Sequence, residues 1–283
     1  MKNTLMIISA LLFSLPAFAS NDCAENEENC WDCGKTANDL CTARKDGTKL
    51  TITGSGDMAS YGNVTLPWGT DINELEIEGI TSVGTLAFRG TQIKQINVPK
   101  SVSYLQDGAF QNMPELTNVW FESGGQVYIA GASFQITPKL QSLILPEDIV
   151  KLNYNNFLAS SLQTLVLPDS LFNDNGTGLH YMTFKSGMTI YCSEKNHQKC
   201  ENYFKTAREY CGKENGVSLE CPIENIHLQT YEKYGDEYFA NGKFYARFSD
   251  IGTQNNIKKR IYTVKEAEKL SKPSGNTFKL RYK

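Results

Sequence analysis

The sequence predicts an α/β repeat protein: a solenoid with a parallel sheet on one face, disulfide-tied ends and a small α+β module at the C-terminal end. Three observations lead to this fold class. A two-part apolar pattern recurs from residue 72 onward, with starts 21 to 26 residues apart. Eight cysteines form two groups of four that flank the repeats. Beyond residue 224 the chain becomes basic and rich in tyrosine.

Residues 1–19 have the features of a secretory signal peptide. Lys2 supplies a positive charge, residues 5–15 are almost wholly apolar, and Ala17-Phe18-Ala19 forms a small-x-small cleavage site. The apolar run is short for a membrane span, and no later stretch reaches about 18 consecutive apolar residues. An uncleaved anchor is the alternative. We expect a mature chain from Ser20 that is secreted, extracellular or held at the cell surface, with the periplasm as a further location, and no transmembrane segment after cleavage.

The cysteine spacing favours structural disulfides. In an exported chain, two groups of four cysteines indicate two disulfides at each end, and each group allows three pairings. Cys30-Trp31-Asp32-Cys33 also has the spacing of a redox motif or of half a zinc site. Its acidic, Asn-rich surroundings do not suit the strand and helix that flank a redox motif, and a zinc site would need a second closely spaced pair, which the sequence lacks. We therefore expect no metal and no cofactor. The expected disulfide cysteines are Cys23, Cys30, Cys33, Cys41, Cys192, Cys200, Cys211 and Cys221.

The middle of the chain, residues 72–191, consists of five repeat units. Each opens with apolar-x-x-apolar-x-apolar and closes with a small or polar residue before a phenylalanine. The units are residues 72–92, 93–115, 116–139, 140–161 and 162–187. The closing residues are Phe88, Phe110, Phe134, Phe157 and Phe184. Before them, residues 20–71 contain the first cysteine group and lead-in strands.

The spacing within a unit predicts one strand and a returning segment. In the fourth unit, Leu143 and Leu145 alternate with Ser142 and Ile144, so the leucines point inward from a strand. Pro146 then ends the strand, because proline cannot donate a ladder hydrogen bond. The wider spacing of the second half suits a turn or a short helical piece. Neighbouring units must stack, since one unit alone cannot bury its apolar side chains.

These residues resemble a known family. The units are similar to the leucine-rich repeats of the BspA-like class, whose pattern is L-x-x-I-x-I-P-x-x-V-x-x-I-x-x-x-A-F. The Gly/Asp-rich lead-in, with Pro67-Trp68, resembles the segment that precedes such repeats. The resemblance covers about residues 33–191. The third unit departs from the pattern with Gly124-Gly125 in place of proline, and the fifth is longer at residues 173–178.

The resemblance implies a leucine-rich-repeat solenoid. It also implies a secreted or surface-exposed protein that binds proteins or host surfaces without catalysis. The fold and the absence of catalysis are therefore expectations, and the resemblance does not identify the partner.

The outward positions of the expected strands supply a candidate contact surface. Glu74, Glu76 and Glu78 make one end acidic, while apolar side chains stand at the other end on strands about 4.8 Å apart. Exposed apolar rows often mark contact surfaces, and tryptophan is a common interface anchor. Covering by the C-terminal region, or ordinary surface exposure, is the alternative. The candidate partner-binding residues are Glu76, Asn97, Asn118, Trp120, Ile144 and Val166.

Residues 192–223 read as a disulfide-tied cap. A helix is expected from Ser193, a plausible N-cap, to Tyr210. Cys200 and Cys211 would lie about 16 Å apart along it and could not bond to each other. Two pairings remain open, either 192–200 with 211–221 or 192–211 with 200–221. The cap would shield the open end of the repeat stack.

Residues 224–283 form the small C-terminal module. Asn241-Gly242 between two aromatic runs is a hairpin signal. Residues 263–270 have a helical pattern, and residues 277–282 resemble a strand. Lys258-Lys259-Arg260 opens the last stretch.

The overall net charge of −3 conceals a strong asymmetry. Residues 20–71 carry −5 and residues 72–191 carry −4, whereas residues 192–283 carry +5. The last 26 residues alone carry +7. Near-neutrality over the whole chain does not fit a nucleic-acid partner. The basic tail, residues 258–283, is expected to attach electrostatically to an anionic surface or to the acidic solenoid, with a solvated basic face as the alternative.

The sequence contains none of the common catalytic or phosphate-binding motifs. Gly-x-Ser-x-Gly, His-Glu-x-x-His, the P-loop and Gly-x-Gly-x-x-Gly are all missing from the sequence. The expected function is therefore non-catalytic recognition of a protein or glycan partner through the sheet face. The alternative is an envelope-structural protein, or an enzyme whose active part is the C-terminal module with the repeats as its scaffold.

Overall fold

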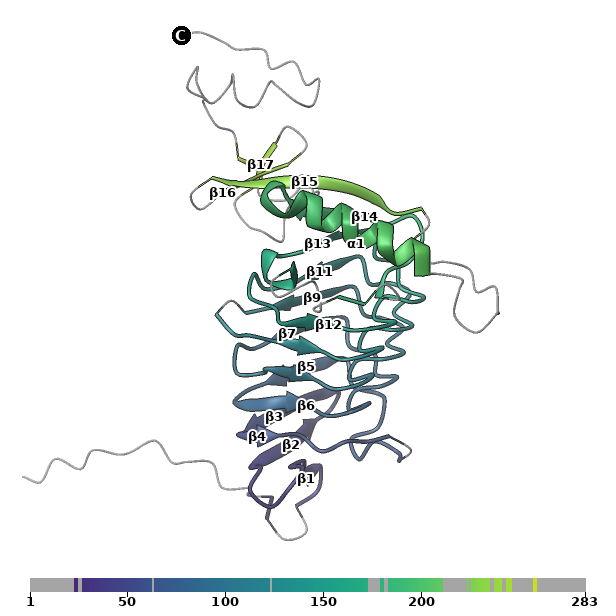
Figure 1. Cartoon of the computed structure of the whole chain (residues 1–283). Helices are drawn as coiled ribbons and strands as arrows, with labels where there is room; N and C mark the ends of the chain where they lie inside the picture. Colours follow the sequence, from purple (N-terminus) through teal and green to yellow (C-terminus); the bar gives the residue numbers. More distant parts are fainter. Residues whose placement is uncertain are drawn as a thin grey trace, which may run out of the picture.

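The chain winds into a stack of rungs with strands on two sides (Figure 1). The computed structural model describes residues 23–24, 27–62, 64–122, 124–172, 179–180, 183–210, 223, 225–234, 237–240, 243–245 and 257–258. The expected signal peptide, residues 1–19, lies outside these residues.

The first strand of each unit stacks on that of the next, and we call these the A strands. They are β5 (Glu74–Ile77), β7 (Gln95–Val98), β9 (Asn118–Phe121), β11 (Ser142–Ile144) and β13 (Thr164–Val166). Neighbours run parallel, so that Ile96 pairs with Val119 and Val119 with Leu143. These three side chains are buried, as the apolar alternation predicts. We call the outward side of the A strands the A face.

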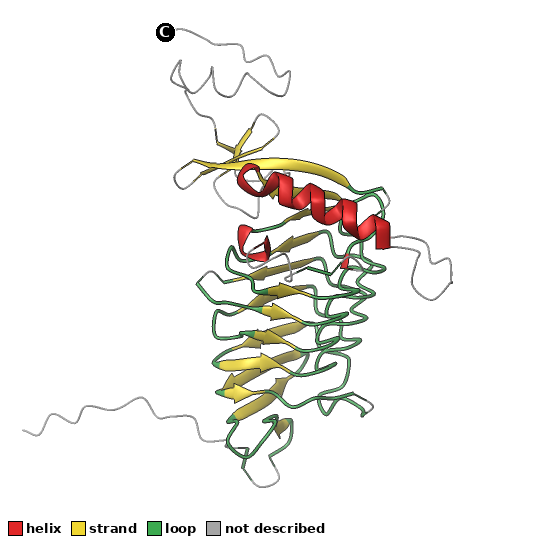
Figure 2. Cartoon of the chain, in the orientation of Figure 1, coloured by secondary structure: helices red, strands yellow, loops and turns green. Residues whose placement is uncertain are grey.

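The returning half of each of the first four units also forms a strand, where the sequence predicted a turn or a short helical piece. These B strands are β6 (Ile80–Val83), β8 (Tyr104–Leu105), β10 (Tyr128–Ile129) and β12 (Lys151–Leu152). They build a second parallel sheet with β4 (Gly56–Asp57), so the solenoid has a sheet on each of two sides (Figure 2). These strands form because stacking brings equivalent backbone groups of successive units into register, and the buried peptide groups thereby find the hydrogen-bond partners that they need.

A column of aromatic rings runs through the core. The five closing phenylalanines are all almost fully buried. Phe110 stacks on Phe88 with ring centroids 5.4 Å apart and on Phe134 at 5.7 Å. Trp68 extends the column at one end, 6.1 Å from Phe88, and Phe204 of the cap extends it at the other, 5.1 Å from Phe184.

The N-terminal end is closed by antiparallel strands. β1 (Cys30–Asp32) pairs with β2 (Cys41–Asp46), which pairs with β3 (Lys49–Gly54). β3 then runs parallel to β5, so the cap continues directly into the A sheet. Disulfides join Cys23 to Cys30 and Cys33 to Cys41.

The C-terminal end is closed by a helix. β14 (Thr189–Ser193) follows β13 in parallel and leads through a 3-10 turn, η4 (Glu194–Asn196), into α1 (His197–Tyr210). The Ser193 hydroxyl accepts from the Asn196 amide at 3.2 Å and so caps η4. The Cys192–Cys200 disulfide ties α1 to β14. Cys211 and Cys221 lie outside the described residues.

The C-terminal module begins as a continuation of the sheet. β15 (His227–Tyr234) pairs in parallel with β14 over five residues, while β16 (Glu237–Ala240) and β17 (Lys243–Tyr245) form the expected antiparallel hairpin. β18 (Ile257–Lys258) pairs with β17. The 3-10 turn η1 (Asp169–Phe172) follows β13. The helix expected at 263–270 and the strand at 277–282 lie outside the described residues.

Candidate partner-binding groove

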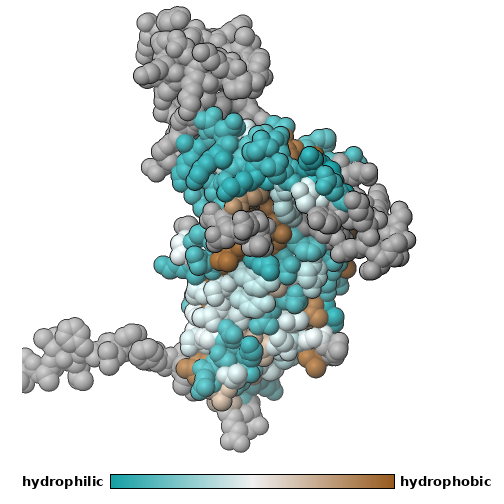
Figure 3. All heavy atoms as spheres, viewed as in Figure 1, coloured by the Kyte–Doolittle hydropathy of each residue, from teal (hydrophilic) through white to brown (hydrophobic). Residues whose placement is uncertain are grey.

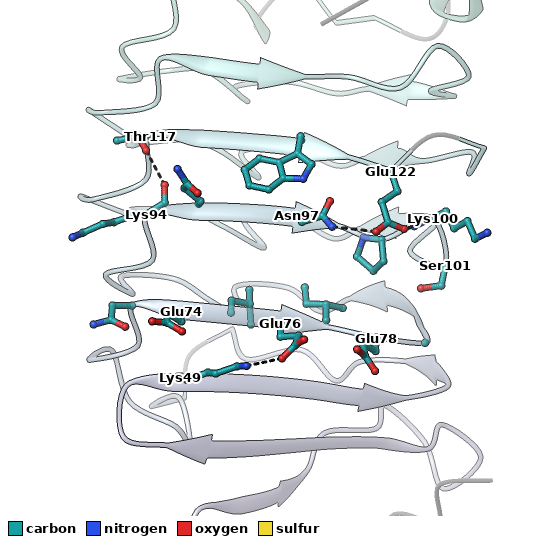
Figure 4. A pocket seen from close by; sticks show the side chains of 17 residues that line it. Lys49, Glu74, Glu76, Glu78, Lys94, Asn97, Lys100, Ser101, Thr117 and Glu122 are labelled. Carbon is teal, nitrogen blue, oxygen red and sulfur yellow. Dashed lines mark hydrogen bonds and ion pairs between the residues drawn. The ribbon is translucent and has the colours of Figure 1, made fainter. Parts of the chain in front are cut away.

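An open groove of about 1050 Å³ lies on the A face between β5 and β9. Its lining combines carboxylates, amides and ammonium groups with a few apolar side chains. Its lining includes Lys49, Glu74, Leu75, Glu76, Glu78, Lys94, Asn97, Pro99, Lys100, Ser101, Trp120 and Glu122. Figure 4 shows the carboxylates of β5 along one side of the groove and Asn97 on the next strand.

Trp120 and Asn97 are direct neighbours on the A face. The parallel register of β7 and β9 places Asn97 opposite Trp120. The Asn97 amide donates to Glu122 Oε1 at 3.1 Å, and the Lys100 backbone amide donates to Glu122 Oε2 at 3.3 Å. Both oxygens of Glu122 are thereby held, so this side chain stands in a defined place beside the half-buried tryptophan.

The opposite side of the groove carries a row of carboxylates. Glu74, Glu76 and Glu78 all point outward from the β5 region and are exposed. Lys49 on β3 forms an ion pair with Glu76, with Nζ to Oε2 at 2.7 Å. The hydrogen bond to Glu76 raises the pKa of Lys49, and the charge of Glu76 adds to this effect. Desolvation lowers the same pKa, and the charges of Glu74 and Asp46 raise it further.

The groove lies where the hydrogen-bonded ladder of the A strands is interrupted. One hydrogen-bonded ladder, β1-β2-β3-β5, ends at β5, and another, β7-β9-β11, begins at β7. The facing edges of β5 and β7 are therefore not laddered to each other, and half-buried Leu75 lies at the groove between them. An unladdered strand edge presents backbone N–H and C=O groups to solvent.

The structure brings together three of the six residues predicted for partner binding. Glu76, Asn97 and Trp120 all line the groove. Asn118 is half-buried on β9 and donates to Thr117 Oγ1 at 3.1 Å, outside the groove lining. Ile144 pairs through its backbone with Trp120, while its side chain lies outside the described part of the structure.

Val166 does not belong to an exposed row, contrary to the prediction. Only 7% of it is exposed, and its partner in the neighbouring strand, Tyr191, is 4% exposed. The returning strand β15 explains this, because the Tyr231 hydroxyl donates to the Leu167 carbonyl at 3.4 Å and Lys233 pairs with Glu147 at 3.0 Å. Figure 3 shows hydrophobic residues gathered below the cap on the side in view.

Several groove residues were not in the predicted set. Glu122 follows Trp120 by two positions, so the alternation of the strand could have identified it. Lys49 belongs to the lead-in, and Lys100 and Ser101 belong to a turn, so no repeat column indicates them. The Ser101 hydroxyl is buried at the groove, and within the described part of the chain it has no hydrogen-bond partner.

Neither metal chemistry nor a membrane span emerges from the described residues. Among them, no three His, Cys, Asp or Glu side chains lie close enough to hold a metal ion. In the same part of the chain, no helix is long and apolar enough to cross a membrane.

The stacked units define the class of protein as a leucine-rich-repeat solenoid. Residues 68–190 match the family described as BspA type leucine-rich repeat region, in six copies. This segment is thus a BspA-type leucine-rich repeat region, as the resemblance indicated. Five units were counted from the sequence, and the matched region begins earlier, at Trp68, whose ring extends the phenylalanine column.

A solved structure of a leucine-rich repeat protein from Eubacterium ventriosum is similar to this chain. The two share 23% sequence identity with a TM-score of 0.47, over 59% of this chain and 45% of that one. The chain therefore spans less than half the length of that protein. No curated protein matches the chain.

Proposed function

We propose that this protein is a secreted or cell-surface recognition protein that binds its partner through the A face, without catalysis. The groove beside Trp120 is the observation that carries the proposal. It combines a half-buried tryptophan, a restrained Asn97–Glu122 pair and a carboxylate row on one open surface. Aromatic side chains with polar neighbours are typical of binding surfaces.

Export is part of the proposal. The sequence features of residues 1–19 support it, and so do the disulfides Cys23–Cys30, Cys33–Cys41 and Cys192–Cys200, because disulfides persist in oxidising compartments. A repeat scaffold outside the cytoplasm with an open polar groove suits recognition of molecules at a cell surface.

We further propose that the basic tail, residues 258–283, attaches the protein to an anionic surface. Its charge of +7 supports this, because the repeats carry net negative charge and would not by themselves adhere to such a surface. The tail would then localise the protein, and the A face would select its partner.

Retention of partners from a cell-surface extract tests the recognition proposal. The immobilised wild type is compared with Trp120→Ala and with Tyr154→Ala, which removes an aromatic side chain that is 41% exposed and lies outside the groove. We expect Trp120→Ala to lose retained material and Tyr154→Ala to keep it. If Trp120→Ala folds and retains the same material as the wild type, the A face is not the recognition surface.

A further inference from the structure

The A strands are not laddered between β5 and β7, nor between β11 and β13, and the first of these two breaks forms the floor of the groove. Between β5 and β7 the side chain of Leu75, which the alternation directs inward, is only half-buried and lines the groove. Beside it run two strand edges that are not laddered to each other. The floor therefore offers apolar surface and backbone hydrogen-bonding groups together.

Trp120 and Pro99 add two further apolar surfaces. Both are half-buried, so each is held by the fold while part of it faces the groove. A fixed indole face is electron-rich and attracts the weakly positive C–H groups of a ring laid against it. Such a surface suits a flat ring that carries its hydrogens on its faces and its polar groups at its rim.

Polar groups of both kinds surround these apolar surfaces. Glu74 and Glu78 supply acceptors, and Lys94 and Lys100 supply donors. A hydroxyl group both donates and accepts, so a ligand with many hydroxyl groups could bond to the carboxylates and to the ammonium groups of the groove. Hydrogen bonds to charged partners are the stronger ones.

The charge of the groove argues against a strongly charged ligand. Its lining contains four glutamates and three lysines, a net charge of only −1. Glu76 is paired with Lys49, and Glu122 is bonded to Asn97 and to the Lys100 backbone. A basic peptide would meet Lys94 and Lys100 in the groove, whereas a neutral ligand would not be repelled.

We propose that the groove binds a neutral oligosaccharide of glucose-type rings, with one ring against Trp120 and its hydroxyl groups on the surrounding carboxylates and amides. Glucose-type rings carry their substituents equatorially, which leaves a flat C–H face on each side. The volume of about 1050 Å³ exceeds that of most small-molecule sites, roughly 300–1,000 Å³, and so suits several linked rings. This inference rests on the proposed recognition by the A face and names its ligand class.

Titration with three defined hexasaccharides tests the inference. The probes are the linear β-1,4-glucose, β-1,3-glucose and β-1,4-N-acetylglucosamine hexamers, added to the full chain and followed by calorimetry and tryptophan fluorescence. At least one should bind, and Trp120→Ala should weaken its binding by about tenfold or more. Trp120→Phe, which retains a ring, should lose less, and Tyr154→Ala should bind as the wild type does.

Thermal unfolding of each variant separates lost binding from lost folding, because Trp120 is partly buried. The inference is wrong if none of the hexamers binds at millimolar concentration, or if the folded Trp120→Ala protein binds as the wild type does. Binding of a lysine-rich hexapeptide that depends on Trp120, with no saccharide binding, would also overturn it. That last outcome would leave recognition by the A face intact, whereas unchanged retention of cell-surface material by Trp120→Ala would contradict the proposed function itself.

Discussion

Ala159 occupies the same place in its repeat as Gly90 does in an earlier one. Each lies two residues after a column phenylalanine, and each has a left-handed backbone, with φ of 57° for Ala159 and 78° for Gly90. The stacked turns require this conformation whatever residue the sequence supplies. A residue with a Cβ pays about 1–2 kcal/mol for it, whereas glycine does not.

Replacing Ala159 with glycine should therefore stabilise the protein. Removing the backbone strain should outweigh the greater entropy of glycine in the unfolded chain, so we expect a gain of about 0.5–1 kcal/mol in the free energy of unfolding. Ala159 is exposed, so little packing is lost. Urea denaturation measures the change.

The reciprocal change, Gly90→Ala, serves as the matched control. A Cβ at Gly90 would meet its nearest neighbour, Thr70 Cγ2, at an ordinary 3.6 Å, so only the backbone should resist it. We expect Gly90→Ala to destabilise. A loss of stability in Ala159→Gly would show that the turn does not carry the strain its φ angle implies.

Tyr61 should make stability fall at alkaline pH. Burial, with a smaller contribution from Asp32, raises the pKa of Tyr61 to about 12, while the unfolded chain ionises near 10. The contribution of Tyr61 to the free energy of unfolding is fully present below pH 10. It is lost as pH rises toward 12, because between these pH values only the unfolded state releases the tyrosine proton. The slope should reach about 1.4 kcal/mol per pH unit.

The variant Tyr61→Phe isolates this effect from the other titrating groups. The ring of Tyr61 packs against Trp68 with centroids 4.9 Å apart, and phenylalanine preserves that contact. The difference in unfolding free energy between wild type and variant, measured by urea denaturation at pH 8, 10 and 11, should shift in favour of the variant above pH 10. Parallel pH profiles would contradict the prediction.

Removing the Cys192–Cys200 disulfide should loosen the C-terminal cap. The bond joins β14 to α1 across eight residues, and chain-entropy arguments assign such a loop about 2–3 kcal/mol. In the double variant Cys192→Ala/Cys200→Ala, amide hydrogen exchange of α1 should accelerate. The variant Cys23→Ala/Cys30→Ala, which opens a loop of similar length at the other end, should leave exchange in α1 unchanged. Equal exchange in all three proteins would show that the disulfide does not secure the cap.

Deleting residues 258–283 should abolish attachment to an anionic surface. The deletion removes a charge of +7, and salt should have the same effect on the full chain because it screens exposed charges. Cosedimentation with vesicles of phosphatidylglycerol and phosphatidylcholine at 50 and 500 mM salt measures both. A tail of the same composition in scrambled order should still attach, and salt-independent attachment would refute the electrostatic proposal.

The core was predictable because its pattern repeats. Burial of Phe88, Phe110 and their equivalents follows from period and hydrophobicity, which need no knowledge of distant contacts. The repeat pattern did not place Trp68 in this column, since it is not a phenylalanine and the segment before it has only Leu50 and Ile52 of the apolar opening, with Gly47 at the first position. Its place in the column becomes evident from the 6.1 Å contact with Phe88.

The B strands were not predictable in the same way. Tyr104-Leu105 and Tyr128-Ile129 are two-residue strands, too short for alternation to distinguish from a turn. Their pairing comes from the stacking of one rung on the next, which is a tertiary effect. Likewise, the hairpin of residues 237–245 followed from its turn signal, whereas the pairing of β15 with β14 had no local signal.

Periodicity establishes that Glu76, Asn97 and Trp120 come from equivalent strand positions, because in-register parallel strands place equivalent residues side by side. It cannot show that the ladder stops between β5 and β7, nor that Val166 is covered. Both depend on contacts between segments far apart in the chain: the stacking of successive rungs, and the return of Tyr231 and Lys233 over the last units. The repeat thus specifies the scaffold and its columns, while long-range packing decides which part of the A face stays open.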